Sequence, residues 1–217
     1  MFTAPPEQSL EWSDEGVIGA NRFLKRLWKA VHDHVSAGAA SALPLALDPS
    51  ALLDADRDLR RIAHQTLTKV KDDIGRRRVF NTAVAAVMEL LNAISRHSGD
   101  TPAARATRQE ALEIAVLCLA PVVPHITHQL WRELGRQQPL WQTRWREADL
   151  AALAQQSIEI VVQVNGKLRG RIHAAPDASE DQLRAAALAD ESVQRHLEGR
   201  EPRKVIIVRG RLVNVVV

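Results

Sequence analysis

The sequence has a single cysteine, Cys118, and no apolar run of the roughly 20 residues that a membrane-spanning helix needs. One thiol excludes an intramolecular disulfide and any zinc site built from several thiolates. Because Cys118 falls within the apolar segment 111–119, we expect a buried, unreactive thiol. We see neither a secretory signal peptide nor a membrane anchor, and therefore expect a protein of the reducing cytosol.

The sequence also lacks a large excess of one charge, since it has 29 Lys and Arg residues and 26 Asp and Glu residues. Bulk charge therefore does not indicate a nucleic-acid-binding protein, and any site for a polyanion must come from local clustering. The chain lacks a glycine-rich phosphate-binding loop and any recognisable pairing of a nucleophile with a base. Its 217 residues suffice for one fair-sized domain, or for a medium and a small one.

The hydrophobic period is helical from residue 13 to residue 135. Ser13, followed by two acidic residues, can cap a first helix that ends near Gly38. Further helices are predicted over 54–74 and 80–95. Because short connections join long amphipathic helices, the pattern predicts an antiparallel, up-and-down bundle.

Residues 120–131, Ala-Pro-Val-Val-Pro-His-Ile-Thr-His-Gln-Leu-Trp, predict a stiff corner between two more helices. Pro121 halts the preceding helix, and Pro124 suits the first turn of the next, where its missing N–H is not needed. His125 and His128 are three residues apart, but no third metal ligand with suitable spacing is evident. We therefore expect these histidines to pack or cap, and expect no metal site.

The period changes to two after residue 157. The predicted strands are 158–163, 168–172, 205–208 and 212–217. Ser179 and Gln182 have capping-box spacing, so a short helix is expected between the two hairpins. The predicted fold class is α+β, an N-terminal antiparallel helical bundle followed by a small ββαββ-type module. The predicted divisions are a bundle over 1–138, a connector over 139–156 and the module over 157–217.

Asn165-Gly166 offers a choice of register for the first hairpin. The dipeptide favours a two-residue type I′ turn, but that turn places the apolar residues of one strand on the same face as the charges of the other. A three-residue loop would instead pair Val162 with Leu168 and put Gly166 at a bulge. We predict the three-residue loop, which leaves three cations together on the outer face, namely Lys167, Arg169 and Arg171.

Several segments, in order along the chain, resemble one family of enzymes. The proline corner resembles the anticodon-binding helical domain of the class I synthetases for valine, isoleucine, leucine and methionine. Segments that resemble bacterial leucyl-tRNA synthetase in particular are 1–12, 19–28, 72–77, 80–83, 162–170 and 210–214. One departure is Arg146, which follows Trp145 where the family tends to have proline.

The family's His-Ile-Gly-His and Lys-Met-Ser-Lys-Ser motifs do not occur, and nothing resembles its editing domain. The resemblance thus implies a C-terminal part without catalytic residues or a cofactor of its own, whereas the full-length enzyme would use ATP and magnesium. It implies a monomer that binds tRNA(Leu) beside the rest of the synthetase and does not catalyse leucylation alone. The bundle is expected to hold the tRNA stem and body, and the terminal module to reach the corner where the D and T loops meet.

The candidate RNA contacts are cations in three clusters. On the first helix, cations three and four residues apart form one stripe, for which a solvated face is the alternative that the resemblance argues against. At the break near Gly75, capping and RNA contact are equally compatible. Around the two C-terminal turns, the alternative is edge charge that discourages strand pairing. The candidate contacts are Arg22, Arg26, Lys29, Arg76, Arg77, Lys167, Arg169, Arg171, Arg209 and Arg211.

Two further expectations concern apolar residues. Trp28 and Trp131 lie at apolar helix positions, so we expect them in the core and not as stacking platforms for bases. A different class of function also stays open, a stand-alone interaction module that docks protein through its apolar second hairpin.

Overall fold

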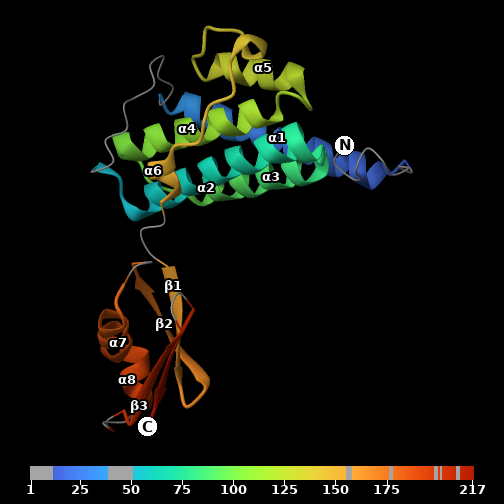
Figure 1. The fold of residues 1–217 in the computed structure, drawn as a ribbon. Coiled ribbons are helices and arrows are strands. Elements are labelled where there is room, and N and C mark those ends of the chain that lie inside the picture. The colour runs from blue at the N-terminus through green and yellow to red at the C-terminus, as the bar shows by residue number, and fades with distance from the viewer. Residues whose placement is uncertain are drawn as a thin grey trace. The chain divides into compact units, whose positions relative to one another are not determined.

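The computed structural model describes residues 12–38, 51–154, 158–175, 178–197, 200, 202–208 and 211–217. The chain forms two compact units, Met1–Leu153 and Ala154–Val217. Figure 1 shows helices in the first unit, and a sheet with helices in the second. This order confirms the predicted α+β class, with the helical bundle first and the small module after it.

The first unit packs amphipathic helices around one core. Ser13 caps α1 as predicted, because its hydroxyl accepts a hydrogen bond from the Gly16 N–H. The proline corner is also confirmed, with Pro124 in the first turn of α5. The five long helices are α1 (Asp14–Ser36), α2 (Asp54–Asp72), α3 (Phe80–Arg96), α4 (Pro102–Leu119) and α5 (Pro124–Glu133).

Helix α4 is buried on nearly every side, and it contains Cys118. Burial raises the pKa of the Cys118 thiol, which agrees with the expected unreactive residue. Trp131 of α5 is buried as predicted, and its indole N–H donates to the Gln138 carbonyl. The prediction for Trp28 was wrong, since it is 43% exposed. Its helix α1 buries Phe23 and Leu27 instead, on a narrower stripe than the spacing indicated.

Two short elements follow α5, namely η3 (Leu140–Gln142) and α6 (Leu150–Leu153). Leu140 is buried in the core of the first unit, and Trp145 packs partly against it. Trp141 is 73% exposed, with its ring centroid 4.6 Å from that of His128. Residues 139–153 are therefore part of the first compact unit.

The second unit is a four-stranded sheet in the order β2-β1-β4-β3. The central strands β1 and β4 are parallel, and both outer pairs are antiparallel. The strands are β1 (Ile158–Val164), β2 (Lys167–Ala174), β3 (Lys204–Val208) and β4 (Leu212–Val216). Helices α7 (Glu180–Ala189) and α8 (Glu191–Leu197) lie together on one side of the sheet (Figure 1).

The predicted capping box at Ser179 and Gln182 begins α7. Helix α8 was not predicted. The Asp190 carboxylate begins it by accepting from the N–H groups of Ser192 and Val193, both at 3.0 Å. The module therefore has two helices between its hairpins.

The prediction of a three-residue hairpin loop was wrong. Val164 pairs with Lys167, so the turn has two residues. Asn165 and Gly166 have φ values of 50° and 75°, the positive values that a type I′ turn requires. The dipeptide therefore keeps its ordinary turn preference.

A bulge in β2 corrects the phase of the strands instead. Gln163 pairs with Leu168, whereas Val162 pairs with Gly170, which leaves Arg169 as the extra residue. Beyond the bulge, Ile160 lies opposite Ile172, and both side chains are buried. The apolar faces of β1 and β2 thus match through the bulge and not through the turn.

Candidate nucleic-acid interface

The cationic stripe of α1 lies on its exposed face. Arg22 and Lys25 are exposed, and neither forms an ion pair with any described residue. Arg26 donates to the Asn92 side-chain oxygen of α3 at 2.6 Å, and Lys29 pairs with Asp33 one turn later at 2.6 Å. Because exposed ion pairs contribute little, the stripe can exchange these partners for phosphates at small cost.

Arg76 and Arg77 lie in a π-helical turn, η2 (Asp73–Arg77), that extends α2. Arg76 makes two hydrogen bonds to Asp72, at 2.6 and 2.9 Å. The hydrogen bond from Arg76 holds the pKa of the Asp72 carboxyl below its ordinary value. Arg77 pairs in the same way with the buried Asp73 at 2.7 Å. The spacing of four residues between these partners was a signal that sequence analysis missed.

The cations of the second unit do not form the patch that the predicted register implied. Lys167 lies opposite Val164, and Arg171 lies opposite Val161. Because side chains alternate along β1, Lys167 and Arg171 belong to opposite faces of the sheet. Arg171 donates to Glu159 at 3.0 Å. Lys167, Arg169 and Arg171 are all exposed, as is Arg211, whereas Arg209 lies outside the described residues.

Strand β1 brings Arg171 and Arg211 to the same level of the sheet. The Val161 N–H donates to the Arg211 carbonyl, and Val161 is also the Cα partner of Arg171 on the other side. Two strand spacings separate these backbones by about 10 Å. The β4 partner of Val161 is Leu212, however, so the register puts Leu212 and not Arg211 on the face that Arg171 occupies, and the two cations share a level of the sheet without forming one patch.

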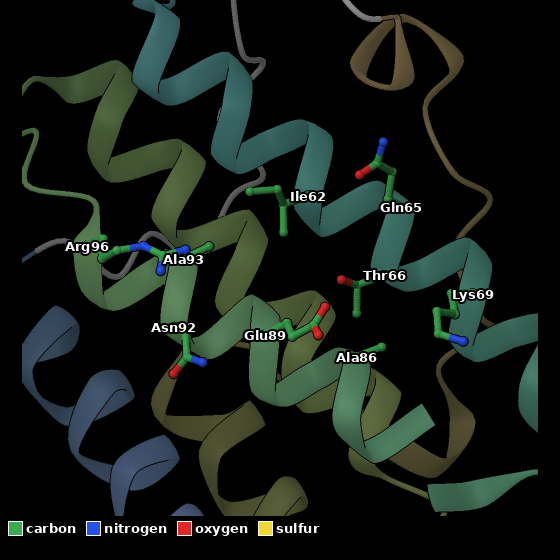
Figure 2. Close-up of a pocket in the computed structure, with 9 residues that line it drawn as sticks. All are labelled: Ile62, Gln65, Thr66, Lys69, Ala86, Glu89, Asn92, Ala93 and Arg96. Carbon is green, nitrogen blue, oxygen red and sulfur yellow. The ribbon is translucent and has the colours of Figure 1, made fainter. Parts of the chain in front are cut away.

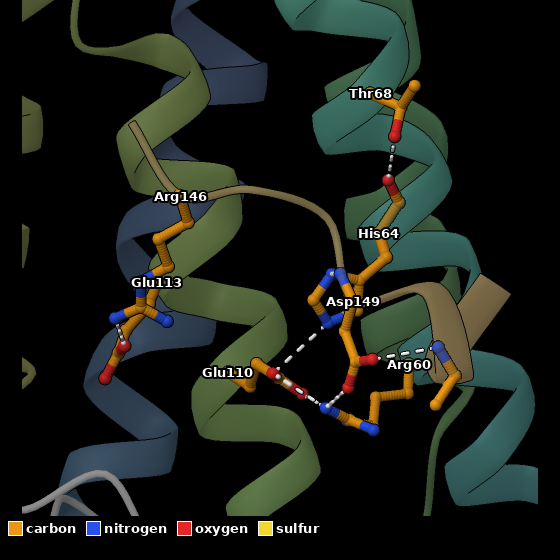
Figure 3. A network of polar contacts seen from close by, with 8 residues as sticks. Arg60, His64, Thr68, Glu110, Glu113, Arg146 and Asp149 are labelled. Atoms are coloured by element: carbon orange, nitrogen blue, oxygen red, sulfur yellow. Dashed lines mark hydrogen bonds and ion pairs between the residues drawn. The ribbon is translucent and has the colours of Figure 1, made fainter. Parts of the chain in front are cut away.

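A partly buried network of charges joins α2, α4 and the segment before α6 (Figure 3). Arg60 donates to Glu110 at 2.7 Å and to Asp149 at 2.8 Å. His64 contacts Glu110 through Nε2 at 3.2 Å, and its Nδ1 accepts from the Asp149 N–H at 3.1 Å. We call these four residues the connector latch. Its partners are far apart in sequence, so no local pattern indicated it.

Glu113 of α4 forms a second buried charge cluster. Its carboxylate is 1% exposed, binds Arg136, and accepts from Arg146 at 2.5 Å. The Gln109 amide also donates to it at 2.8 Å. Arg146, the position at which the chain departs from the resembled pattern, therefore ties the connector to α4 (Figure 3).

Ionisable groups of the first unit make its stability depend on pH. Burial alone would raise the pKa of Glu110, but hydrogen bonds from His64 and Arg60 outweigh it, so that pKa lies below its ordinary 4.5. The hydrogen bond from Arg60 lowers the pKa of Asp149 below 3.8. For His34, burial lowers the pKa below 6.5. In all three cases the unfolded chain binds protons first, so stability falls as pH falls.

We expect the free energy of unfolding to decline in two steps on acidification. The first begins as pH falls through 6.5, because unfolded His34 gains a proton that the folded state resists. The second begins as pH falls through 4.5, where Glu110 of the unfolded chain gains a proton, and continues through 3.8, where Asp149 of the unfolded chain does so. Thermal melts between pH 7.5 and 3 measure both steps, and His34→Gln should remove only the first. A constant melting temperature across this range would contradict the prediction.

A groove of about 430 Å³ lies between α2 and α3. Figure 2 shows that its labelled polar side chains come from both helices, with Lys69 and Arg96 offset by Glu89. Lys69 also pairs with Asp73 at 2.8 Å, so its charge is compensated and the groove shows no preference for a polyanion. Among the described residues, no three His, Cys, Asp or Glu side chains come together in a way that could hold a metal ion. The described helices also include none long and apolar enough to cross a membrane.

The family model for the anticodon-binding domain of tRNA ligase matches residues 56–184, and the chain belongs to this family. Its curated relatives include the leucine–tRNA ligase of Halorhodospira halophila, 54% identical over 216 residues. That of Thioalkalivibrio sulfidiphilus is 57% identical over 217 residues. Each match covers 100% of this chain and 26% of the relative, so the chain spans about a quarter of their length.

A solved structure is similar over nearly the whole chain. It is the ternary complex of LeuRS, tRNA and LeuAMS from Agrobacterium radiobacter K84, with a TM-score of 0.74 and 25% identity. The match covers 99% of this chain and 28% of that one. The comparisons give no support to the alternative of a stand-alone module that docks protein.

Proposed function

We propose that this chain is the tRNA-binding C-terminal part of a leucine–tRNA ligase. The observation that carries the proposal is the identity of 54% to 57% with such ligases over the full chain. In this proposal the bundle over 1–138 and the module over 157–217 hold the tRNA, and 139–156 connects them. The chain itself catalyses no leucylation.

The mechanism is positional. By holding the stem and body of tRNA(Leu), the two parts place the acceptor end in a catalytic site carried by the rest of the synthetase. A misplacement of about 1 Å in such a site can reduce the rate on the order of a hundredfold. The exposed cations of α1 support this role, because Arg22 and Arg26 are one turn apart and can reach neighbouring phosphates.

We expect this chain alone to bind tRNA weakly and without preference for leucine acceptors, because specificity is shared with domains that it does not contain. Affinity should fall with salt, with a logarithmic slope of roughly −0.7 to −0.9 for each phosphate neutralised. Fluorescence anisotropy with labelled tRNA(Leu) and a second tRNA, from 25 to 300 mM salt, measures both quantities. Binding that ignores salt, or no binding at the lowest salt, would count against the proposal.

The stripe on α1 is tested by the double substitution Arg22→Ala and Arg26→Ala. We expect tRNA affinity to fall by about tenfold, the loss of two charge-assisted contacts. The melting temperature should hardly change, because exposed substitutions cost less than about 0.5 kcal/mol each. Arg57→Ala with Arg61→Ala is the matched control, a pair one turn apart on α2 with its own carboxylate partners. Equal loss of affinity in both pairs would remove the stripe from the interface.

A further inference from the structure

A hollow of about 380 Å³ lies among α1, α3 and α4. Among the described residues, three cations line it, namely Arg26 and Lys29 from α1 and Arg108 from α4. Asp33 is the single carboxylate among these described lining residues, and it pairs with Lys29. With His34 neutral, the lining carries an excess of two positive charges, and a concave surface of one sign concentrates the opposite ion.

The two guanidinium groups are held in place and still have donors to offer. Arg108 uses Nη2 to donate to the carbonyls of His97 and Gly99, at 3.0 and 2.7 Å. Arg26 uses Nη2 for Asn92. In the described part of the chain, the remaining nitrogens of both groups have no acceptor, and Arg108 has no carboxylate partner. Fixed guanidinium forks with free N–H groups suit phosphate oxygens.

His34 supplies an independent observation in the lining of the hollow. It is 3% exposed, and its Nε2 lies 2.7 Å from the Gln109 side-chain oxygen. The Gln109 amide nitrogen donates to Glu113 and Leu134, so its oxygen is the acceptor and Nε2 carries the hydrogen. Nδ1 is buried without a partner among the described residues. An unsatisfied buried acceptor of this kind is costly unless it gains a proton or a donor.

The charges around His34 explain what a bound anion would change. Burial lowers the pKa of His34, and Arg108 and Arg105 of α4 lower it further. The hydrogen bond with Gln109 and the charge of Glu113 act in the opposite direction. From α1, Lys29 and Asp33 also line the hollow and offset each other. An anion in the hollow would offset the positive charges of Arg108 and Arg105 and favour the protonated His34 ring.

We propose that this hollow binds a phosphate group through Arg26, Lys29 and Arg108. The phosphate of an RNA backbone is the source that we favour, and this source rests on the proposed function. Only part of the α1 stripe belongs to this site, because Arg26 and Lys29 line the hollow whereas Arg22 and Lys25 do not. Its third cation comes from α4, which the stripe does not include.

The test follows the His34 ring of the full chain by NMR. Sodium phosphate should shift its signals in a saturable way at constant ionic strength, with an affinity on the order of 1 mM for so small an ion. Sodium chloride should not shift the His34 signals in this way. The signals of the exposed His125 ring serve as the internal control and should not show the saturable shift. The phosphate should also raise the pKa of His34. The addition of tRNA at low salt should produce the same shift.

Matched variants show whether the three cations hold the ion. Lys29→Gln and Arg108→Gln should each weaken phosphate binding by about tenfold. Lys25→Gln, on the same helix but outside the hollow, should leave it within about twofold. Because Arg108 also holds two carbonyls, melts accompany each variant, and the exposed Lys29→Gln keeps the test valid if Arg108→Gln unfolds.

Three outcomes are distinguishable. A His34 ring that ignores phosphate, or equal binding by Lys29→Gln and Lys25→Gln, overturns the site. If tRNA binds without moving the His34 ring, the RNA source is overturned while the proposed function stands. If phosphate binds and tRNA does not, the hollow is a site for free phosphate, and the proposed function fails instead.

Discussion

Replacement of Glu113 with alanine is expected to lower the free energy of unfolding of the first unit by about 3 kcal/mol. The carboxylate is 1% exposed and is the common partner of Arg136 and Arg146. Without it, both guanidinium groups lose their carboxylate, and the Gln109 amide keeps only the Leu134 carbonyl. The cost lies at the lower end for a broken buried pair, because Arg146 is 35% exposed and can turn to water.

Thermal melts measure this loss as a fall in melting temperature of about 6–12 °C. Glu89→Ala is the control, an exposed glutamate on α3 for which we expect a change within about 0.5 kcal/mol. Glu113→Gln should be intermediate, since it keeps an acceptor but not the charge. If Glu113→Ala and Glu89→Ala have the same melting temperature, the Glu113 cluster does not stabilise the fold.

Gly170→Ala is expected to destabilise the second unit by about 2 kcal/mol. An added Cβ would lie 2.8 Å from Asp190 Oδ1 and 3.0 Å from Val193 Cγ2. That oxygen cannot easily move, because it accepts from the backbone N–H groups of Ser192 and Val193 and so begins α8. The glycine is therefore required by close packing of β2 against α8, next to the bulge at Arg169.

Hydrogen exchange distinguishes this effect from a general loss of stability. Amides of β1 and β2 should exchange faster in Gly170→Ala, while those of α4 should not change. Gly19→Ala is the control, because nothing lies within 4 Å of the added carbon in α1. Alanine there should stabilise the helix by about 0.5–1 kcal/mol. Equal stability of the two variants would contradict the packing argument.

Local signals predicted most of the fold. Ser13 and the Ser179–Gln182 pair cap helices as their spacing indicates, and Pro124 begins α5. The period of two located all four strands. The hairpin failed because we let the turn alone correct the strand phase, whereas a bulge at Arg169 does so and leaves the type I′ turn intact. The residues 167–170 give no signal for a bulge that is strong enough to decide between a three-residue loop and a two-residue turn followed by a bulge.

The candidate interface was only partly predictable. Spacing identified the α1 stripe as one face, but it did not show that Arg76 and Arg77 bind carboxylates of their own helix turn, although the four-residue separation was visible. The sequence could not show that Arg108 and Arg26 line the same hollow, because this depends on the packing of α3 and α4 against α1. Contacts between distant segments depend on tertiary structure, and the connector latch is of the same kind.

The connector latch extends the first unit beyond its last long helix. Asp149 is bound by Arg60 and His64, and its carboxylate also accepts from the Ala151 N–H at the start of α6, at 2.9 Å. The segment that leads into α6 is therefore fastened to α2, a much earlier part of the chain, mainly by polar contacts. Such a segment can open locally at a smaller free energy than unfolding of the whole unit requires, so its amides should lose protection from hydrogen exchange before those of α4.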